Sequence, residues 1–158
     1  MAEDKMAHLT AGPISRNSIV EQFVAGAASL KLWMPVKITA AATTTSPATV
    51  NVTATGADPL VIGVLVGGAN MDAENGYANK DSGDLVLVCT FGPCKCYVDG
   101  GTANIVLGDG LVSDVTSGYG IKGTYATDMD AVFAMALMAA TEDGDIIEVY
   151  VGKVGTLA

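Results

Sequence analysis

Short runs of β-forming residues, each followed by a turn sequence, constrain the fold of this chain more than any other feature. The clearest runs lie at residues 60–66, 84–90, 94–98 and 146–151. They are rich in Val, Ile and Leu, and turn residues (Gly, Asp, Ser or Pro) recur about every eight to twelve residues. This spacing predicts an all-β fold, a small barrel or sandwich.

Glycine, proline and polar residues mark where we expect the chain to turn or to form loops. Gly92-Pro93 is expected to turn the chain between two of these runs. Residues 40–49, rich in Ala, Thr and Ser, and residues 67–83, rich in Asn, Asp and Gly, are expected to be surface loops. Further short strands are expected at residues 36–38, 50–52, 105–107 and 111–112.

For the Ala- and Met-rich stretch at residues 131–140, the helix propensity of its residues and the sequence that follows favour different structures. Ala, Met and Leu favour a helix. However, residues 142–145 (Glu-Asp-Gly-Asp) form a short hairpin connection to a run that carries Ile147, Val149 and Val151 on one face. Because a hairpin needs a partner strand, we predict a strand over residues 131–140.

The beginning of the chain differs from the rest. Residues 1–17 have no sustained period and contain Gly12-Pro13, which predicts an extended N-terminal arm. Residues 18–27 fit either an amphipathic helix or a strand, and both alternatives remain open. With 158 residues in total, residues 18–158 are expected to form a single β-rich domain.

Charge and hydropathy argue against several classes of partner. The net charge is −9 and the basic residues do not cluster, so we expect no nucleic-acid partner, which would require dense Lys and Arg contacts. Residues 1–37 hold four of the eight basic residues and three of the seventeen acidic ones, so the acidity lies in the body. No apolar run approaches the roughly 18 residues of a membrane helix, so we expect no membrane partner. The polar N-terminus lacks the pattern of a secretory signal and suggests synthesis in the cytoplasm.

The glycine-rich segment Gly118-Tyr-Gly-Ile-Lys-Gly123 matches the letters of the dinucleotide-binding motif G-x-G-x-x-G. That motif binds a pyrophosphate only when it follows a strand and opens a helix. Residues 124–127 show no helical period. We therefore interpret the segment as a turn between strands and expect no cofactor.

The cysteines and the histidine also offer little chemistry. Cys89, Cys94 and Cys96 lack the number and the spacing of zinc ligands, and alternation places Cys94 and Cys96 on one face of a strand, where cysteine acts as a small hydrophobic residue. His8 is the only histidine and lies in the expected arm, a poor place to hold a catalytic base. We expect no metal site, no catalytic residues and no enzyme activity.

Four motifs, taken in order, resemble those of a known family. They are an "IGV" run at residues 62–64, the Ser-Gly-Asp-Leu-Val-Leu-Val run at 82–88, the Gly-Asp-Gly-Leu-Val run at 108–112, and a small-residue stretch from 131 that ends in Asp-Gly-Asp-Ile-Ile-Glu-Val-Tyr-Val at 143–151. In this order, the chain is similar to the small head-decoration proteins of tailed viruses, specifically the family long described as a phage domain of unknown function. The resemblance covers about residues 20–153.

The resemblance implies a tulip- or barrel-like β body that forms homotrimers on the outer capsid surface of a bacteriophage head. The partners would be the major capsid protein and neighbouring decoration subunits, the latter reached through the N-terminal arm by adding a strand to a sheet edge. The function would be structural, to stabilise the capsid by bridging its subunits. The protein would be made in the host cytoplasm and reside in the virion. As subunit or capsid contacts we expect Ile14, Arg16, Ile19, Phe23 and Trp33.

Two alternatives remain open. One is another structural protein, from a virion, a tail or a surface array. The other, from a different class, is a small β-barrel that binds a ligand.

Overall fold

The computed structural model describes residues 18–124 and 126–152. Of these residues, none lies in an α-helix, and the all-β prediction is confirmed. The predicted arm, residues 1–17, lies outside the described residues. The elements are β1 (Ile19–Ala25), β2 (Pro35–Ala40), β3 (Thr49–Val52), β4 (Val61–Gly68), β5 (Leu85–Asp99), β6 (Gly110–Ser113), β7 (Gly120–Lys122), the 3-10 turn η1 (Met129–Ala131), β8 (Ala134–Ala136) and β9 (Asp143–Val151).

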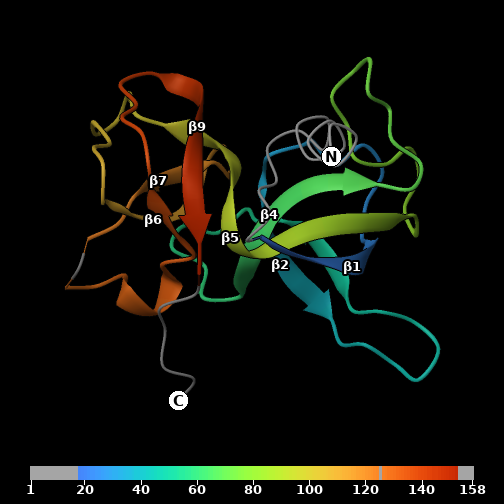
Figure 1. Ribbon diagram of the computed structural model, residues 1–158. Helices are drawn as coiled ribbons and strands as arrows, with labels where there is room; N and C mark the ends of the chain where they lie inside the picture. The colour runs from blue at the N-terminus through green and yellow to red at the C-terminus, as the bar shows by residue number, and fades with distance from the viewer. Residues whose placement is uncertain (1–17, 125, 153–158) are drawn as a thin grey trace, which may run out of the picture.

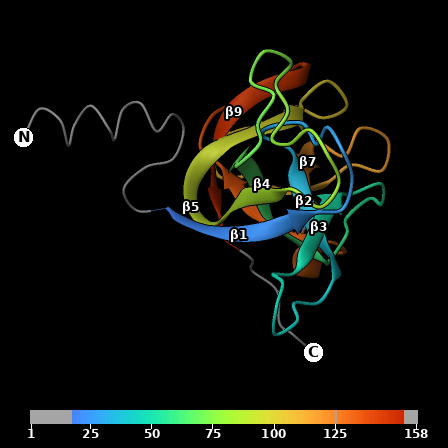
Figure 2. The ribbon, with the colours of Figure 1, turned by 90° about the vertical axis from the view of Figure 1, so that its right-hand side faces the viewer.

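The strands close into two small barrels that share β5. The pairing order is β1-β3-β2-β4-β5-β7-β6-β8-β9, and additional pairings join β1 to β5 and β5 to β9. The first barrel therefore closes on the first half of β5, and the second barrel closes on its second half. Figure 1 shows the two lobes side by side with β5 passing from one to the other, and Figure 2 shows β1 running along β5 in the wall of the first barrel.

The prediction of a turn at Gly92-Pro93 is wrong, because β5 continues through these residues. The strand changes partner here: Phe91 lies opposite Ile19 of β1, and Gly92 lies opposite Val151 of β9. Gly92 has a φ of +97°, which glycine adopts without steric cost, and the backbone changes direction without reversing. The Gly-Pro pair thus marks the boundary between the barrels.

Residues 19–25 form a strand, which decides between the two alternatives for the segment after the arm. β1 pairs antiparallel with β5 from Ile19 opposite Phe91 to Val24 opposite Leu85. Ser18 adds a hydrogen bond from its hydroxyl to the carbonyl of Pro93, 2.6 Å away. The pairing with β5, a long-range contact, favours the strand over the amphipathic helix.

The strand predicted at residues 131–140 is shorter than expected. Only β8 is extended, and it pairs antiparallel with β9, as a hairpin requires, with Met135 opposite Tyr150. The chain then leaves β9, because Ala140 exchanges backbone hydrogen bonds with Ile105 at 2.9 and 3.0 Å. The connection between β8 and β9 is consequently longer than the predicted turn at residues 142–145, and β9 already begins at Asp143.

Most of the other predicted strands are confirmed, and one is not. Strands β2, β3, β4, β6 and β9 cover the runs at 36–38, 50–52, 60–66, 111–112 and 146–151 almost completely. Residues 105–107 form only an isolated bridge at Ile105, and Leu107 is 71% exposed. In β9, Ile147, Val149 and Val151 are buried on one face, as the alternation predicts.

The segment at residues 67–83 is not wholly a surface loop, since Ala78 and Asn79 are completely buried. The side chain of Asn79 accepts a hydrogen bond from the backbone N–H of Leu30 (2.9 Å) and donates to the carbonyls of Ala27 (2.8 Å) and Asp81 (2.7 Å). One polar side chain therefore satisfies three backbone groups and fastens the loop to the first barrel.

Two glycines of β4 provide a test of this packing. A Cβ atom at Gly63 would overlap the carbonyl oxygen of Cys89 in β5, whereas one at Gly67 would meet only Leu87 and Met71, at 3.6 Å or more. We expect Gly63→Ala to lower the free energy of unfolding by about 3 kcal/mol, because the β4–β5 backbones must separate. The matched variant Gly67→Ala should change it by less than about 0.5 kcal/mol. Urea denaturation measures both, and equal stability of the two variants would contradict the strand packing described.

Candidate functional site

The three cysteines are free and buried, on or near the inner face of β5. Lys95, between Cys94 and Cys96, is exposed, so the two thiols share one face as predicted. Burial raises the pKa of Cys96, and a hydrogen bond with Cys89 together with burial raises the pKa of Cys94. Such thiols stay protonated at neutral pH and pack as small apolar groups. In the described part of the chain no three His, Cys, Asp or Glu side chains gather as metal ligands would.

The G-x-G-x-x-G segment, residues 118–123, begins in the turn before β7 and includes the whole of β7, so the predicted turn covers only its first residues. A Cβ atom at Gly118 would lie 2.8 Å from the carbonyl oxygen of Thr53, and one at Gly120 would lie 3.3 Å from a methyl of Val98. These glycines therefore allow close packing against the protein itself. Lys122, within the motif, belongs to a strand paired with β6. The segment does not open a helix that could hold a phosphate.

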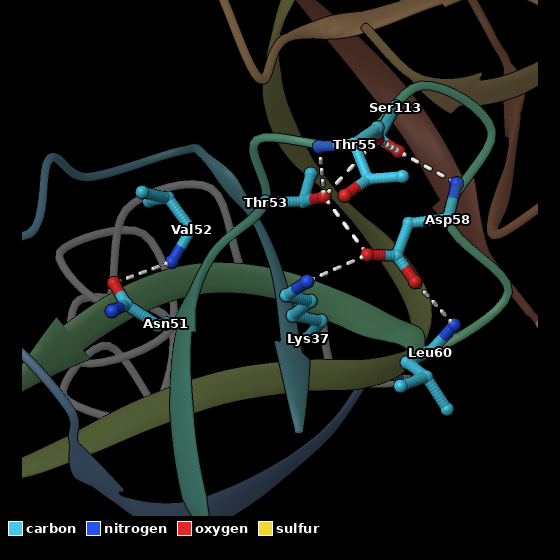
Figure 3. Close-up of polar contacts among 8 residues, drawn as sticks. All are labelled: Lys37, Asn51, Val52, Thr53, Thr55, Asp58, Leu60 and Ser113. Carbon is cyan, nitrogen blue, oxygen red and sulfur yellow. Dashed lines mark hydrogen bonds and ion pairs between the residues drawn. The ribbon is translucent and has the colours of Figure 1, made fainter. Parts of the chain in front are cut away.

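A buried polar cluster joins the two barrels (Figure 3). Asp58, only 4% exposed, receives hydrogen bonds from the ammonium of Lys37 on β2 (2.9 Å) and from the hydroxyl of Thr53 (3.1 Å). Its backbone N–H donates to the hydroxyl of Ser113 on β6 (3.0 Å), and that hydroxyl donates to the carbonyl of Thr55 (2.9 Å). Every polar atom of the cluster has a partner, so its role is to hold the barrels together.

The charge of Asp58 is stabilised inside this cluster. Burial alone would raise its pKa, but hydrogen bonds from the backbone of Leu60 and from the side chains of Lys37 and Thr53 outweigh burial and hold the pKa below its usual value. The carboxylate is therefore charged at neutral pH, and its lone pairs are already engaged. It is not available as a proton acceptor for a reaction.

An aromatic stack forms a second contact between the barrels. The rings of Tyr97 and Tyr119 stack with centroids 5.3 Å apart, and the ammonium of Lys31 lies 4.0 Å above the Tyr97 ring. Lys31 also donates a hydrogen bond to the hydroxyl of Tyr119 (3.3 Å). Lys31 precedes β2 in the first barrel, whereas the tyrosines belong to the second. This cation–π contact adds to the polar cluster.

An apolar groove is lined by residues of β5, η1, β8 and β9 and by the segments that adjoin them. Its volume is about 390 Å³. Large half-exposed side chains and the buried Ala134 line it, and glycines form much of the remaining wall. Phe91 packs edge-to-face on Tyr150, with ring centroids 5.5 Å apart. The side chains of the groove are Phe91, Met129, Val132, Ala134, Met135 and Tyr150, and its glycines are Gly108, Gly110, Gly123 and Gly152.

Exposure of these side chains makes the groove a surface for binding. Met129 is 50% exposed, Phe91 46% and Met135 43%. Large apolar side chains gathered in one concave place are typical of a surface that another molecule or segment covers. Methionines suit such a surface because their flexible side chains adapt to the shape of what they contact.

Both ends of the described chain lie beside this groove. Ile19, the first residue of β1, is the strand partner of Phe91, and Gly152, just after β9, lines the groove. Because Phe91 and Gly92 are consecutive, β1 begins where β9 ends. The groove thus lies beside both Ile19 and Gly152.

The five predicted contact residues are distributed unevenly. Ile14 and Arg16 lie outside the described residues. Ile19 is 53% exposed beside the groove, whereas Phe23 packs partly against the core of the first barrel. Trp33 has a φ of +67° and joins the barrels through its backbone, which pairs with Leu65 (2.7 Å) and Tyr97 (2.9 Å). Their role as contacts stays a prediction.

Sequence reasoning did not find the groove. Alternation along β9 indicated that Tyr150 points away from the core, and this was the only usable signal. Met129, Met135 and Phe91 come from segments that are brought together only when the barrel closes. The turn expected after Phe91 also gave no reason to place Phe91 beside β9. No single segment of the sequence has a residue pattern that predicts the groove.

Similarity to known proteins is seen among solved structures and not among sequences. No protein family model matches the chain, and no curated protein sequence matches it. Among solved structures, the chain is similar to one described as "The crystal structure of head fiber gp8.5 N base in bacteriophage phi29". The match covers 89% of this chain and 99% of that chain, with 14% sequence identity and a TM-score of 0.47. The resemblance to the head-decoration family stays a prediction.

The polar cluster predicts how stability depends on pH. Because the pKa of Asp58 is lowered by folding, its contribution is present above the ordinary Asp pKa of about 4 and is lost as the pH falls toward the folded-state value. We expect Asp58→Asn to lower the free energy of unfolding by about 1–3 kcal/mol at neutral pH, and by progressively less in acid.

The exposed Asp143 on β9 provides the control, and Asp143→Asn should change stability by less than about 0.5 kcal/mol. Urea denaturation of the three proteins across the acid range checks this. An Asp58→Asn effect that is independent of pH would show that the charge does not stabilise the junction.

Proposed function

We propose that this protein is a structural component of a virion that binds the outer surface of a viral capsid and stabilises it by bridging capsid subunits, without catalysis. One observation carries the proposal. The four motifs of the family resemblance, taken in order, fall on β4, β5, β6 and β8–β9, the strands that build both barrels. The resemblance thus covers five of the nine strands of the described residues, together with some of the turns that join them.

The chemistry of the body supports a structural role. The buried polar side chains of Asp58, Asn79 and Ser113 are engaged in holding the barrels and a loop in place. The body is acidic, since residues 38–158 carry fourteen acidic and four basic residues. Such a surface repels DNA and suits the outside of a capsid better than its inside.

Exposed apolar side chains supply contact area for partners. Beyond the groove, Leu107, Val115 and Leu60 are each more than half exposed, which is more apolar surface than a small soluble body requires. We assign this surface to contacts with the major capsid protein and with two further copies in a homotrimer. Residues 1–17 reach neighbouring subunits.

A binding experiment tests the proposal. Purified protein is added to capsids assembled from the major capsid protein encoded in the same genome, and the mixture is sedimented. We expect cosedimentation at a fixed number of copies per capsid, density on the outer surface in cryo-electron microscopy, and a higher temperature of capsid disruption. Deleting residues 2–17 should weaken the binding and leave the melting temperature of the free body nearly unchanged.

Failure to cosediment with any particle made by that genome would contradict the proposal. Light scattering of the free and of the bound protein tests the trimer separately. A stable monomer in solution combined with unclustered density on the capsid would contradict the homotrimer without affecting capsid binding.

The groove favours one second candidate, a β-barrel module that binds an apolar ligand. If this function is correct, the full-length protein purified from its host should carry a stoichiometric small molecule, which mass spectrometry after denaturation would detect. Met135→Gln should then reduce its occupancy, whereas Met138→Gln, at a similarly exposed methionine away from the groove, should not. A protein free of ligand would contradict this candidate.

A further inference from the structure

We propose that, in the free protein, residues 1–17 of the same chain dock into the apolar groove of the second barrel. This inference rests on the described geometry and does not depend on the proposed capsid function. Its first support is the position of the groove, whose wall includes Phe91, the strand partner of Ile19. The segment before Ser18 therefore starts at the rim of the groove.

Pairing prevents the chain before Ile19 from continuing along β5. The antiparallel pairing of β1 with β5 ends at Phe91, and the antiparallel pairing of β9 with β5 runs from Gly92 to Asp99. From Gly92 onward, β9 therefore replaces β1 as an antiparallel partner of β5. The chain has to leave the sheet at residue 18, next to Tyr150, the half-exposed residue of β9 that packs on Phe91.

The length and the sequence of the segment fit the groove. Ile14 lies five positions before Ile19, and extended chain spans up to about 17 Å over that distance. Farther along, Leu9 and Met6 provide two more apolar side chains. A groove of about 390 Å³ holds a few such side chains rather than a whole peptide.

Charge favours the same occupant. Met129 in the groove is flanked by the acidic residues Asp128 and Asp130, and Asp130 is exposed. The segment carries Arg16 and Lys5 together with Glu3 and Asp4, so its charges balance, whereas residues 38–158 hold fourteen acidic and four basic residues. A second acidic body approaching this rim would meet repulsion, whereas a segment whose charges balance would not.

The tether favours the chain's own segment over that of another copy. Residues joined to the rim by a few peptide bonds have an effective concentration in the millimolar range, far above that of a second molecule in dilute solution. Docking within the chain also avoids the loss of translational and rotational freedom that association of two molecules costs.

Limited trypsin digestion of the full-length protein tests the inference, because docking protects the bond after Arg16. The double variant Met129→Gln/Met135→Gln makes the groove polar, and we expect cleavage at Arg16 to become about tenfold faster. Met71→Gln/Met138→Gln is the matched control: these methionines are 38% and 48% exposed and do not line the groove. The control should be cleaved at the wild-type rate, and circular dichroism should show all three proteins folded.

Three results would overturn the inference. Equal cleavage rates for the two double variants would show that the groove does not bind the segment. Protection that disappears on dilution would show that the segment comes from a second copy. A deletion of residues 2–17 that leaves the binding of an apolar dye such as Nile red unchanged would show that the groove is not covered by the segment, since we expect the deletion to increase dye binding severalfold.

Discussion

Backbone pairing of a single strand, β5, with four others is the constraint on which both barrels depend. Its first half pairs with β1 and β4, and its second half with β9 and β7. The bend at Gly92 lets one continuous strand complete two closed sheets. Because each barrel uses β5 as a wall, loss of this strand would open both, and the two barrels are expected to unfold together. Each barrel alone would also leave half of β5 without its hydrogen-bond partners.

The side-chain contacts between the barrels differ from their cores. The cores are apolar, whereas the junction contains the ion pair of Asp58 with Lys37, the hydroxyl of Ser113 and the stacked tyrosines under Lys31. A buried ion pair adds little net stability, because desolvation offsets much of the attraction. Its hydrogen bonds are directional, however, and they are satisfied in only one arrangement of the barrels. The junction therefore fixes the relative position of the barrels more than it adds to their stability.

Sequence alone predicted the strands and the fold class, because alternation and turn spacing are local properties, as Ile147, Val149 and Val151 illustrate. It failed where the outcome depends on a partner. Gly92-Pro93 has the composition of a turn. It forms a bend within β5 because the strand paired with β5 changes there from β1 to β9. The stretch after Ala136 leaves its strand because Ala140 pairs with Ile105, 35 positions away in the sequence. The groove could not be predicted at all, since it brings together side chains from β5, η1, β8 and β9.

Closure of the barrels also limits how a partner can attach. Adding a strand needs a sheet edge, and closed barrels offer few of them. In the described residues, β1 pairs with β5 along its length but with β3 only at Val24 and Ala25, so residues 19–23 keep one side open to another strand. The exposed Glu21 on this edge disfavours pairing with an acidic partner. This edge and the apolar groove meet at Ile19, so backbone pairing and side-chain docking would both take place where the N-terminal segment joins the body.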